Sequence, residues 1–406
     1  MSSHDDDILA RVALIRLTEP GTRSVHDLVR QYGAVDTLDL LLAGDAPERR
    51  LRKTVATRLA AGDPRRAACE AMERTRRLGA RIVVPGDEEW PAQVEELDRL
   101  TLSGSSDRRV DQETAPPLCI WVRGGLPLHE TLERSVAVVG ARAASPYGVH
   151  VAGGLGYDLV ERDWAVVSGG AFGIDSAAHR GALSAGGPTV AVLACGVDRP
   201  YPVGNTALFD RIADTGLLIS EWPPESEPLR PRFLIRNRVI AAVTRGSVLV
   251  EAAARSGATQ TLRRALGIGR PAMVVPGPVT SAMSVGAHEL LREHPEARLV
   301  TGAAHVIEEV GRIGLDLAPA ARAPQQPRDL LDDEATLVLE SFPRRGPIGP
   351  DEIAVRAGVD IRTTLRKLSM LTEFGLVARR DGGYQLARLS TPAPPRREMR
   401  DSNPLA

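Results

Sequence analysis

The sequence predicts an α/β fold whose centre, about residues 130–310, is a parallel β-sheet covered by helices on both faces. Short runs of apolar residues recur through this region, and between them lie segments long enough for one helix each. Runs that are apolar at every position indicate strands buried on both sides. The six runs are Ser135–Val139, Ala165–Val167, Thr189–Leu193, Leu217–Ile219, Ser247–Val250 and Ala272–Val275.

The composition is that of a globular chain. Its 406 residues are 43% hydrophobic and 25% charged, which suits two to four domains of ordinary size. No apolar stretch reaches the roughly 18 residues of a membrane-spanning helix, and Asp5–Asp7 stand where an export signal would carry positive charge. Cys69, Cys119 and Cys195 are too widely spaced for a CxxC metal pair or a disulfide framework. We therefore expect a cytoplasmic protein.

Residues 1 to about 80 have the apolar spacing of short helices, so we expect a separate helical domain there. Clear examples are Ile8–Leu17, Val25–Tyr32 and Val35–Leu42. Two strand candidates, Ala80–Val84 and Pro117–Val122, lead into the sheet. The polar segment between them, Gly104–Thr114, is predicted to be an exposed loop.

The sheet domain is predicted to span residues 81–315, and the Pro- and Ala-rich residues 316–329 are predicted to be a linker. Residues 330–389 then combine three helix candidates with a terminal hairpin, a pattern typical of a winged helix. The helices are expected at Leu331–Ser341, Pro350–Ala357 and Ile361–Phe374, and the strands at Leu376–Arg379 and Tyr384–Leu386. The tail, 390–406, is predicted to be disordered.

Glycine-rich turns follow three of the predicted strands: Gly140-Ala141-Arg142, Ser168–Asp175 and Ser256–Thr259. Ligands of an open parallel sheet bind beyond the carboxyl ends of its strands, and a glycine-rich turn entering a helix offers N–H groups to a phosphate. We interpret these turns as a phosphate-binding edge; the alternative is that the glycines only permit tight turns. The first turn lacks the GxGxxG spacing of a nicotinamide site, and no cofactor is expected.

The net charge of −1 conceals a local excess of arginine. Residues 229–270 contain nine arginines and a single acidic residue, and Arg230–Arg238 surrounds one aromatic ring, Phe233. Arginines contact phosphates, and an exposed ring stacks on any base. On a helix, Phe233, Arg236 and Asn237 would share a face. The alternative places Phe233 in the core and the arginines on a solvated surface.

The remaining polar residues give little support to catalysis or metal binding. Asp175 and His179 are spaced for contact on a helix, but no nucleophile accompanies them, so we expect both to hydrogen-bond within the structure. The histidines show no HxxxH or HExxH spacing, and no metal site is expected.

Taken together, these motifs resemble one family closely, the DprA/Smf DNA-processing proteins of bacteria. The matching segments are VVGAR (138–142), SGGAFGIDSAAH (168–179), TVAVLACG (189–196) with Tyr201-Pro202, FLIRNR (233–238), VEAAARSGATQT (250–261) and GRPAMVVPG (269–277). The helical N-terminus resembles the SAM-like domain of that family, and residues 330–389 resemble its winged helix.

The resemblance implies a Rossmann-like domain that binds single-stranded DNA without sequence preference. It also implies a homodimer, delivery of the DNA to the RecA recombinase in natural transformation or repair, and no enzymatic activity. The residues expected at the DNA are Gly140, Arg142, Gly169, Gly170, Arg232, Phe233, Arg236, Asn237, Arg238, Ser256 and Gly257.

Two other functions use related parts. Nucleoside-monophosphate phosphoribohydrolases have a similar sheet but depend on the glutamate of a PGGxGTxxE motif, and Ser256–Arg263 contains no carboxylate in the corresponding place. A transcriptional regulator would read duplex DNA with the winged helix and use the sheet as a nucleotide sensor.

Overall fold

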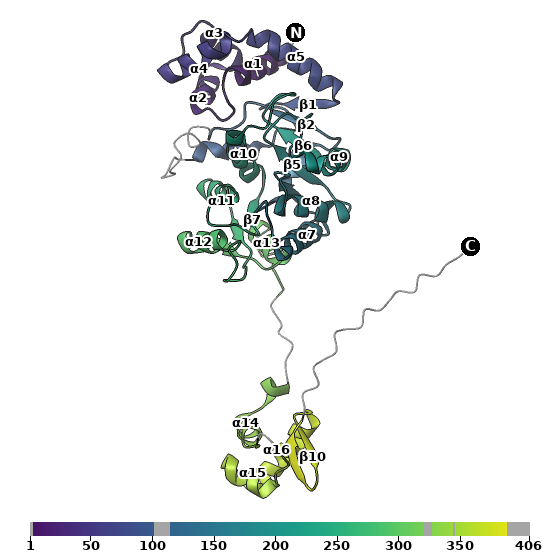
Figure 1. The fold of residues 1–406 in the computed structure, drawn as a ribbon. Helices are drawn as coiled ribbons and strands as arrows, with labels where there is room; N and C mark the ends of the chain where they lie inside the picture. The colour runs from purple at the N-terminus through teal and green to yellow at the C-terminus, as the bar shows by residue number, and fades with distance from the viewer. Residues whose placement is uncertain (1–2, 101–113, 313, 320–326, 344–345, 388–406) are drawn as a thin grey trace, which may run out of the picture. The chain divides into compact units, whose positions relative to one another are not determined.

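The computed structural model describes residues 3–100, 114–312, 314–319, 327–343 and 346–387. The chain forms two compact units, Met1–Pro319 and Ala320–Ala406 (Figure 1). The predicted tail and all of the predicted loop 104–114 except Thr114 lie outside the described residues. Among the residues that are described, no helix combines the length and the apolar character needed to cross a bilayer.

The first unit begins with five helices. They are α1 (Ser3–Leu17), α2 (Arg23–Tyr32), α3 (Ala34–Leu42), α4 (Arg49–Leu59) and α5 (Pro64–Arg77). Helix α1 begins at Ser3 rather than at Ile8, because Asp5 and Asp6 in its first turn complement the positive end of the helix dipole. The apolar faces of these helices share one core with Cys119 and Trp121, so they pack against the edge of the sheet.

Nine strands form the sheet within the described part of the chain, in the order β1-β2-β6-β5-β4-β3-β7-β8-β9. They are β1 (Ala80–Val83), β2 (Ile120–Arg123), β3 (Ser135–Val139), β4 (Ala165–Ser168), β5 (Thr189–Leu193), β6 (Leu217–Ser220), β7 (Gly246–Leu249), β8 (Ala272–Val274) and β9 (Arg298–Leu299). All neighbours from β6 to β9 are parallel, which confirms the predicted parallel core. The two strands β1 and β2 extend the sheet in antiparallel pairing.

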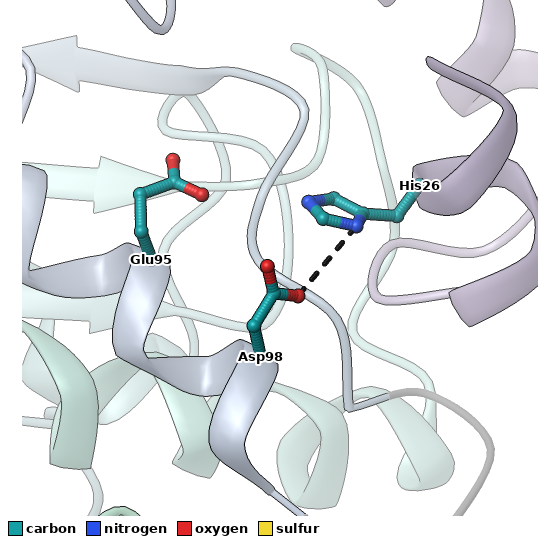
Figure 2. Close-up of side chains that lie close together, drawn as sticks. All are labelled: His26, Glu95 and Asp98. Carbon is teal, nitrogen blue, oxygen red and sulfur yellow. Dashed lines mark ion pairs between the residues drawn. The ribbon is translucent and has the colours of Figure 1, made fainter. Parts of the chain in front are cut away.

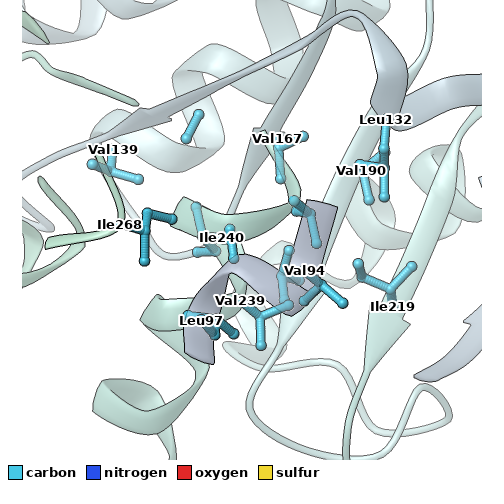
Figure 3. Close-up of a cluster of buried hydrophobic side chains, with 14 of the residues drawn as sticks. Val94, Leu97, Leu132, Val139, Val167, Val190, Ile219, Val239, Ile240 and Ile268 are labelled. Atoms are coloured by element: carbon cyan, nitrogen blue, oxygen red, sulfur yellow. The ribbon is translucent and has the colours of Figure 1, made fainter. Parts of the chain in front are cut away.

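Both faces of the sheet are buried. Along β3, Val136 and Val138 belong to a core shared with α7 and α8, whereas Ala137 and Val139 belong to a second core on the opposite face. Figure 3 shows this second core, where Val139 lies with Ile240 among the labelled side chains. This alternation gives the Rossmann-like arrangement that was expected.

The helices that cover the sheet come from its connections. They are α6 (Leu128–Glu133), α7 (Pro146–Val160), α8 (Ile174–Ser184), α9 (Thr206–Thr215), α10 (Arg230–Val243), α11 (Ala258–Gly267), α12 (Val285–Glu293) and α13 (Ala303–Val310), with the 3₁₀ turns η1 (Ala92–Arg99) and η3 (Val203–Asn205). From β3 the chain proceeds outward through β4, β5 and β6, whereas β7 returns to the other side of β3 and continues to β8 and β9. The connections after β3 and β7 therefore diverge, and a crevice is expected where they separate.

The described residues of the second unit form three α-helices and a hairpin in the predicted order. Its elements are η4 (Pro327–Leu330), α14 (Asp333–Glu340), α15 (Pro350–Ala357), α16 (Ile361–Glu373), β10 (Val377–Arg380) and β11 (Gly383–Leu386). Helix α14 begins two residues later than predicted because the carboxylate of Asp332 caps it, accepting from the Ala335 amide at 2.9 Å. The winged-helix assignment itself stays a prediction.

Candidate nucleic-acid interface

A cleft of about 290 Å³ opens beyond the carboxyl ends of β3 and β7, where the connections of the sheet diverge. It brings together residues from four separate parts of the sequence. Most of the predicted DNA-binding residues line it, namely Gly140, Arg142, Phe233, Arg236, Asn237, Ser256 and Gly257. The predicted residues that do not line it are Gly169, Gly170, Arg232 and Arg238.

The rim of the cleft carries a half-buried aromatic ring between a cation and a second ring. The Arg142 guanidinium carbon lies 5.2 Å from the centre of the Phe233 ring. The Tyr201 ring meets the Phe233 ring edge to face, with the centres 5.8 Å apart. Arg142 is exposed and makes no ion pair with any described residue. The rim can therefore offer both a positive charge and a flat apolar surface to a ligand.

Tyr201 contacts Phe233 at the site and was not among the residues predicted from the sequence. It lies after β5, far along the chain from Phe233, and it is 42% exposed. In the sequence, the Tyr201-Pro202 pair contributes only to the family resemblance. An exposed tyrosine beyond the carboxyl end of a parallel strand was the signal available there.

The inner wall of the cleft holds one buried positive and one buried negative side chain. Arg236 donates through Nη1 to the carbonyl oxygen of Val192, and burial lowers its pKa to about 10. Burial raises the pKa of Asp175, and the charge of Arg236 opposes that shift. Arg236 is only 5% exposed, so its positive charge acts on a ligand mainly through the electrostatic potential in the cleft and little by direct contact.

In the turn after β4, which was predicted to bind phosphate, Gly169 and Gly170 do not line the cleft, and two of the turn's amides are already engaged. The Gly169 and Ala171 amides donate to the Asp175 carboxylate at 3.1 and 3.4 Å. Gly170 has a φ of 70° and packs against the Phe209 ring, where no Cβ could fit. These glycines make the close turn that brings Arg236 and Asp175 under the cleft, and they are buried.

The turn after β7 reaches the cleft directly. Gly257 is exposed and precedes the first residue of α11, so the positive end of that helix faces the opening. The Asn237 amide donates to the Gly257 carbonyl oxygen at 3.3 Å, which links α10 to this turn. Ser256 and Gly257 therefore keep the position that was predicted for them, and their role in DNA binding stays a prediction.

Arg232 does not line the cleft, and its guanidinium is engaged within the fold. Its Nε and Nη2 donate to the Glu19 carboxylate at 3.1 and 3.0 Å, and its guanidinium lies over the Trp222 ring. Although burial favours the protonated acid, the hydrogen bond from Arg232 holds the pKa of Glu19 below its usual range. Arg232 thus ties α10 to the chain between α1 and α2, and its role in DNA binding stays a prediction.

Arg238 is completely buried, so its assignment as a DNA contact is corrected. Its two terminal nitrogens donate to the Glu221 carboxylate at 2.8 and 2.7 Å. The side chains are 0% and 3% exposed, respectively. No ligand can reach this guanidinium in the folded chain, so Arg238 positions α10 against the end of β6.

The nine arginines of residues 229–270 do not form one surface. Besides Arg232, Arg236 and Arg238, the Arg245 side chain donates to the Glu133 carbonyl, and Arg263 pairs with Glu293. Arg264 also has a partner, and Arg270 is buried against Glu96. Of these nine arginines, only Arg230 and Arg255 are exposed and have no partner among the described residues. The local excess of arginine is mostly structural.

Asp175 and His179 do not contact each other in an acid–base pair. Each hydrogen-bonds elsewhere within the structure, as we expected from the sequence. His179 is completely buried, with Nδ1 2.7 Å from the Thr189 hydroxyl. Burial lowers the pKa of His179 to about 3. An acid–base role for this pair has no support in the geometry.

The low pKa of His179 predicts a loss of stability in acid. Below pH 6.5 the unfolded chain binds a proton at this residue that the folded chain excludes, so stability present above 6.5 is lost as the pH falls towards 3. We expect His179→Gln to show a shallower fall in unfolding free energy from about pH 6.5 to 4 in urea titrations. The control replaces another histidine at an exposed position, His150→Gln. Equal slopes for all three proteins would contradict the prediction.

One cluster of histidine and carboxylates comes close to metal-ligand spacing. The ligand atoms of His26, Glu95 and Asp98 lie within 4.8 Å of one another, and Figure 2 shows the His26 ring directed at Asp98. Both Asp98 oxygens already accept from arginines, from Arg23 at 2.6 Å and from Arg30 at 2.9 Å. We interpret the cluster as an ion-pair network that joins α2 to η1.

Comparisons with known proteins identify a family. The profile of the family described as DNA recombination-mediator protein A matches residues 81–311. A Mycobacterium tuberculosis protein named for DNA processing, DprA, is 44% identical over 375 residues, which is 92% of this chain and 93% of the relative. DNA processing protein DprA of Streptococcus pneumoniae is 41% identical over 197 residues, 48% of this chain and 67% of the relative.

A solved structure shows the same likeness in three dimensions. The X-ray structure of DNA processing protein A from Streptococcus pneumoniae superposes with a TM-score of 0.59 at 30% identity, covering 74% of this chain and 98% of that one. Family profile, overall sequence identity and fold point to a single assignment. The chain belongs to the DprA/Smf family of DNA-processing proteins.

Proposed function

We propose that this chain binds single-stranded DNA without sequence preference at the cleft between β3, β7 and α10. The observation that carries the proposal is the Phe233 ring, held between Arg142 and Tyr201 on the rim. A base can stack on such a ring whatever its identity, while Arg142 and the Ser256-Gly257 turn bind the phosphates of the strand. A duplex keeps its base faces stacked inside and cannot use the ring.

The family name supports the wider role that we propose. A recombination mediator acts on DNA by passing it to another protein, and we propose that this chain delivers single strands to a cytoplasmic RecA recombinase as a homodimer. We propose no catalytic step. Asp175 is the one carboxylate that lines the cleft in the described structure, and it is engaged with backbone amides.

The test compares single-stranded with duplex DNA over a range of salt concentrations. We expect tighter binding of the single strand, and Arg142→Ala should make the slope of log K against log salt shallower by roughly 0.7 for each phosphate that Arg142 neutralises. The control is Arg162→Ala, which removes an exposed charge just before β4, at the amino edge of the sheet. Equal affinity for duplex, or a slope that Arg142→Ala leaves unchanged, would contradict the proposal.

The second unit is proposed to be an accessory module. Helix α16 would be the recognition helix of a winged helix, and it carries three basic residues, Arg362, Arg366 and Lys367. Lys367 is bound to Asp332 and Glu334, and Arg366 lies 3.8 Å from Glu334. Arg362 is exposed. Few groups remain there to read base edges in a major groove.

A chain that ends at Leu315 is therefore expected to keep most of its affinity for single-stranded DNA. The first unit has its own buried cores, so the truncated chain should fold. Fluorescence anisotropy with a labelled oligonucleotide measures the affinity. If truncation abolished binding and residues 327–387 selected a particular duplex sequence, the regulator hypothesis would replace this one.

A further inference from the structure

The helix α4 presents an unusual surface of positive charge. It contains five basic residues and no acidic one, and four of the five lie in its first five positions. These four, Arg49, Arg50, Arg52 and Lys53, are all exposed. None makes an ion pair or a side-chain hydrogen bond with any described residue, and the fifth, Arg58, pairs with Glu19.

The spacing of these charges is unfavourable for an isolated helix. Arg49 and Lys53 are four residues apart, and Arg50 and Lys53 are three apart, so they repel each other on one face. No acidic residue in the first turn offsets them, although the helix dipole is itself positive at that end. The N-cap residue Glu48 is the acidic group next to this charge, but it makes no ion pair with the four cations in the described structure.

The next helix along the chain, α5, is equally rich in arginine, but its arginines are paired. All five arginines of α5 form ion pairs: Arg66 with Glu70, Arg76 and Arg77 with Glu73, Arg65 with Asp39, and Arg74 with Glu225. Arginine-rich composition alone therefore does not produce the unpaired surface of α4. The contrast between these two consecutive helices indicates that the cations of α4 bind an anion from outside the chain.

The chemistry of the exposed face favours a nucleic-acid strand as that anion. The apolar residues Leu51 and Val55 are buried in the core, and the outward face carries Thr54, Ala56 and Thr57 beside the cations. A helix that lies on a membrane needs large apolar side chains to insert, and this face has none. Closely spaced cations without aromatic or apolar groups suit a phosphate backbone, whose counterions they displace.

We propose that Arg49, Arg50, Arg52 and Lys53 of α4 form a second DNA-binding surface that holds the backbone of a strand extending beyond the cleft. The proposal rests on the function proposed above for the cleft. The surface contributes sequence-independent affinity for long strands and none for a strand short enough to occupy only the cleft.

The test uses the full-length chain with three substitutions, Arg49→Gln, Arg50→Gln and Lys53→Gln. Glutamine has nearly the helix propensity of arginine and lysine, and like-charge repulsion is removed, so α4 is expected to remain folded. The matched control carries Arg66→Gln, Arg76→Gln and Arg77→Gln on α5, with the same change in net charge. Circular dichroism and thermal melting check the fold of both proteins.

Binding is measured with oligodeoxythymidylates of about 8 and about 40 nucleotides, the shorter within the span of a single site. For the long strand, the α4 variant should lose affinity and its salt slope should become shallower by roughly 2, because three side chains no longer neutralise phosphates. The short strand should bind both variants and the unchanged protein alike. The α5 control should match the unchanged protein on both strands.

Three outcomes would overturn the inference. Unchanged long-strand binding by the α4 variant would show that the surface does not contact DNA. An equal loss of long-strand affinity in the α5 control would show that the effect comes from the change in net charge alone. Loss of binding to vesicles of anionic phospholipid, with DNA affinity kept, would assign the surface to membranes. Phe233→Ala should weaken the binding of both the short and the long strand. If it does not, the cleft proposal fails, and this result is distinguishable from a failure of the α4 proposal.

Discussion

Replacing Arg238 by alanine is expected to lower the free energy of unfolding by about 3–5 kcal/mol. The substitution leaves the Glu221 carboxylate buried without the two charge-assisted hydrogen bonds that now satisfy it. Burial already raises the pKa of Glu221, because desolvation disfavours its charged form even beside Arg238. Equilibrium denaturation in urea, monitored by circular dichroism, measures the loss.

The double variant Arg238→Leu with Glu221→Leu provides the control. Removing both charges leaves no unpaired group in the core, so it should lose less stability than Arg238→Ala alone. A single variant that keeps its stability but loses DNA affinity would assign Arg238 to the DNA after all. Any loss of binding that follows the loss of stability comes from displacement of α10.

Phe233→Ala is expected to weaken binding of single-stranded DNA by about 1–3 kcal/mol, which is the contribution of one stacked base. The ring is half-buried, lies beside Arg142 and Tyr201, and packs only partly against the small core of Ala194, Trp222 and Ile235. The melting temperature should therefore change little. Fluorescence anisotropy at fixed salt measures the affinity.

Two further substitutions separate stacking from packing. Phe233→Leu keeps an apolar side chain but removes the aromatic face, so affinity should fall while stability is retained. Phe233→Trp keeps the face and should retain most of the affinity. If affinity followed thermal stability across the three variants, Phe233 would be a core residue and the solvated-surface alternative for α10 would be correct.

The strands at the centre of the sheet were predictable because their physical environment is uniform. β3 and β5 have the predicted bounds, since every residue of these strands is buried and their interiors are apolar throughout. β9 was not predicted, because its two residues, Arg298 and Leu299, are both exposed and carry no apolar pattern. The antiparallel pairing of β1 and β2 also depends on contacts with β6 that no local pattern reports.

The position of the cleft followed from the sequence as well. Turns that end parallel strands must meet at one edge of the sheet, so the glycine turn after β3 and the Ser256-Gly257 turn after β7 were expected to converge. The structure brings both to the cleft. Whether the amides of a turn are free was not predictable. The Asp175 side chain, which accepts from the Gly169 and Ala171 amides, could equally have pointed elsewhere.

The sequence by itself determined the alternation of strands and helices, the edge of the sheet at which ligands are expected to bind, and the family. Only the tertiary structure decided which arginines of α10 are available to a ligand. Arg232 is neutralised by Glu19, which lies 213 residues away in the chain, and Arg238 is neutralised by Glu221 at the end of β6. Local sequence specifies where a charge sits along a helix, but the partner that removes it from solvent is brought there by the fold.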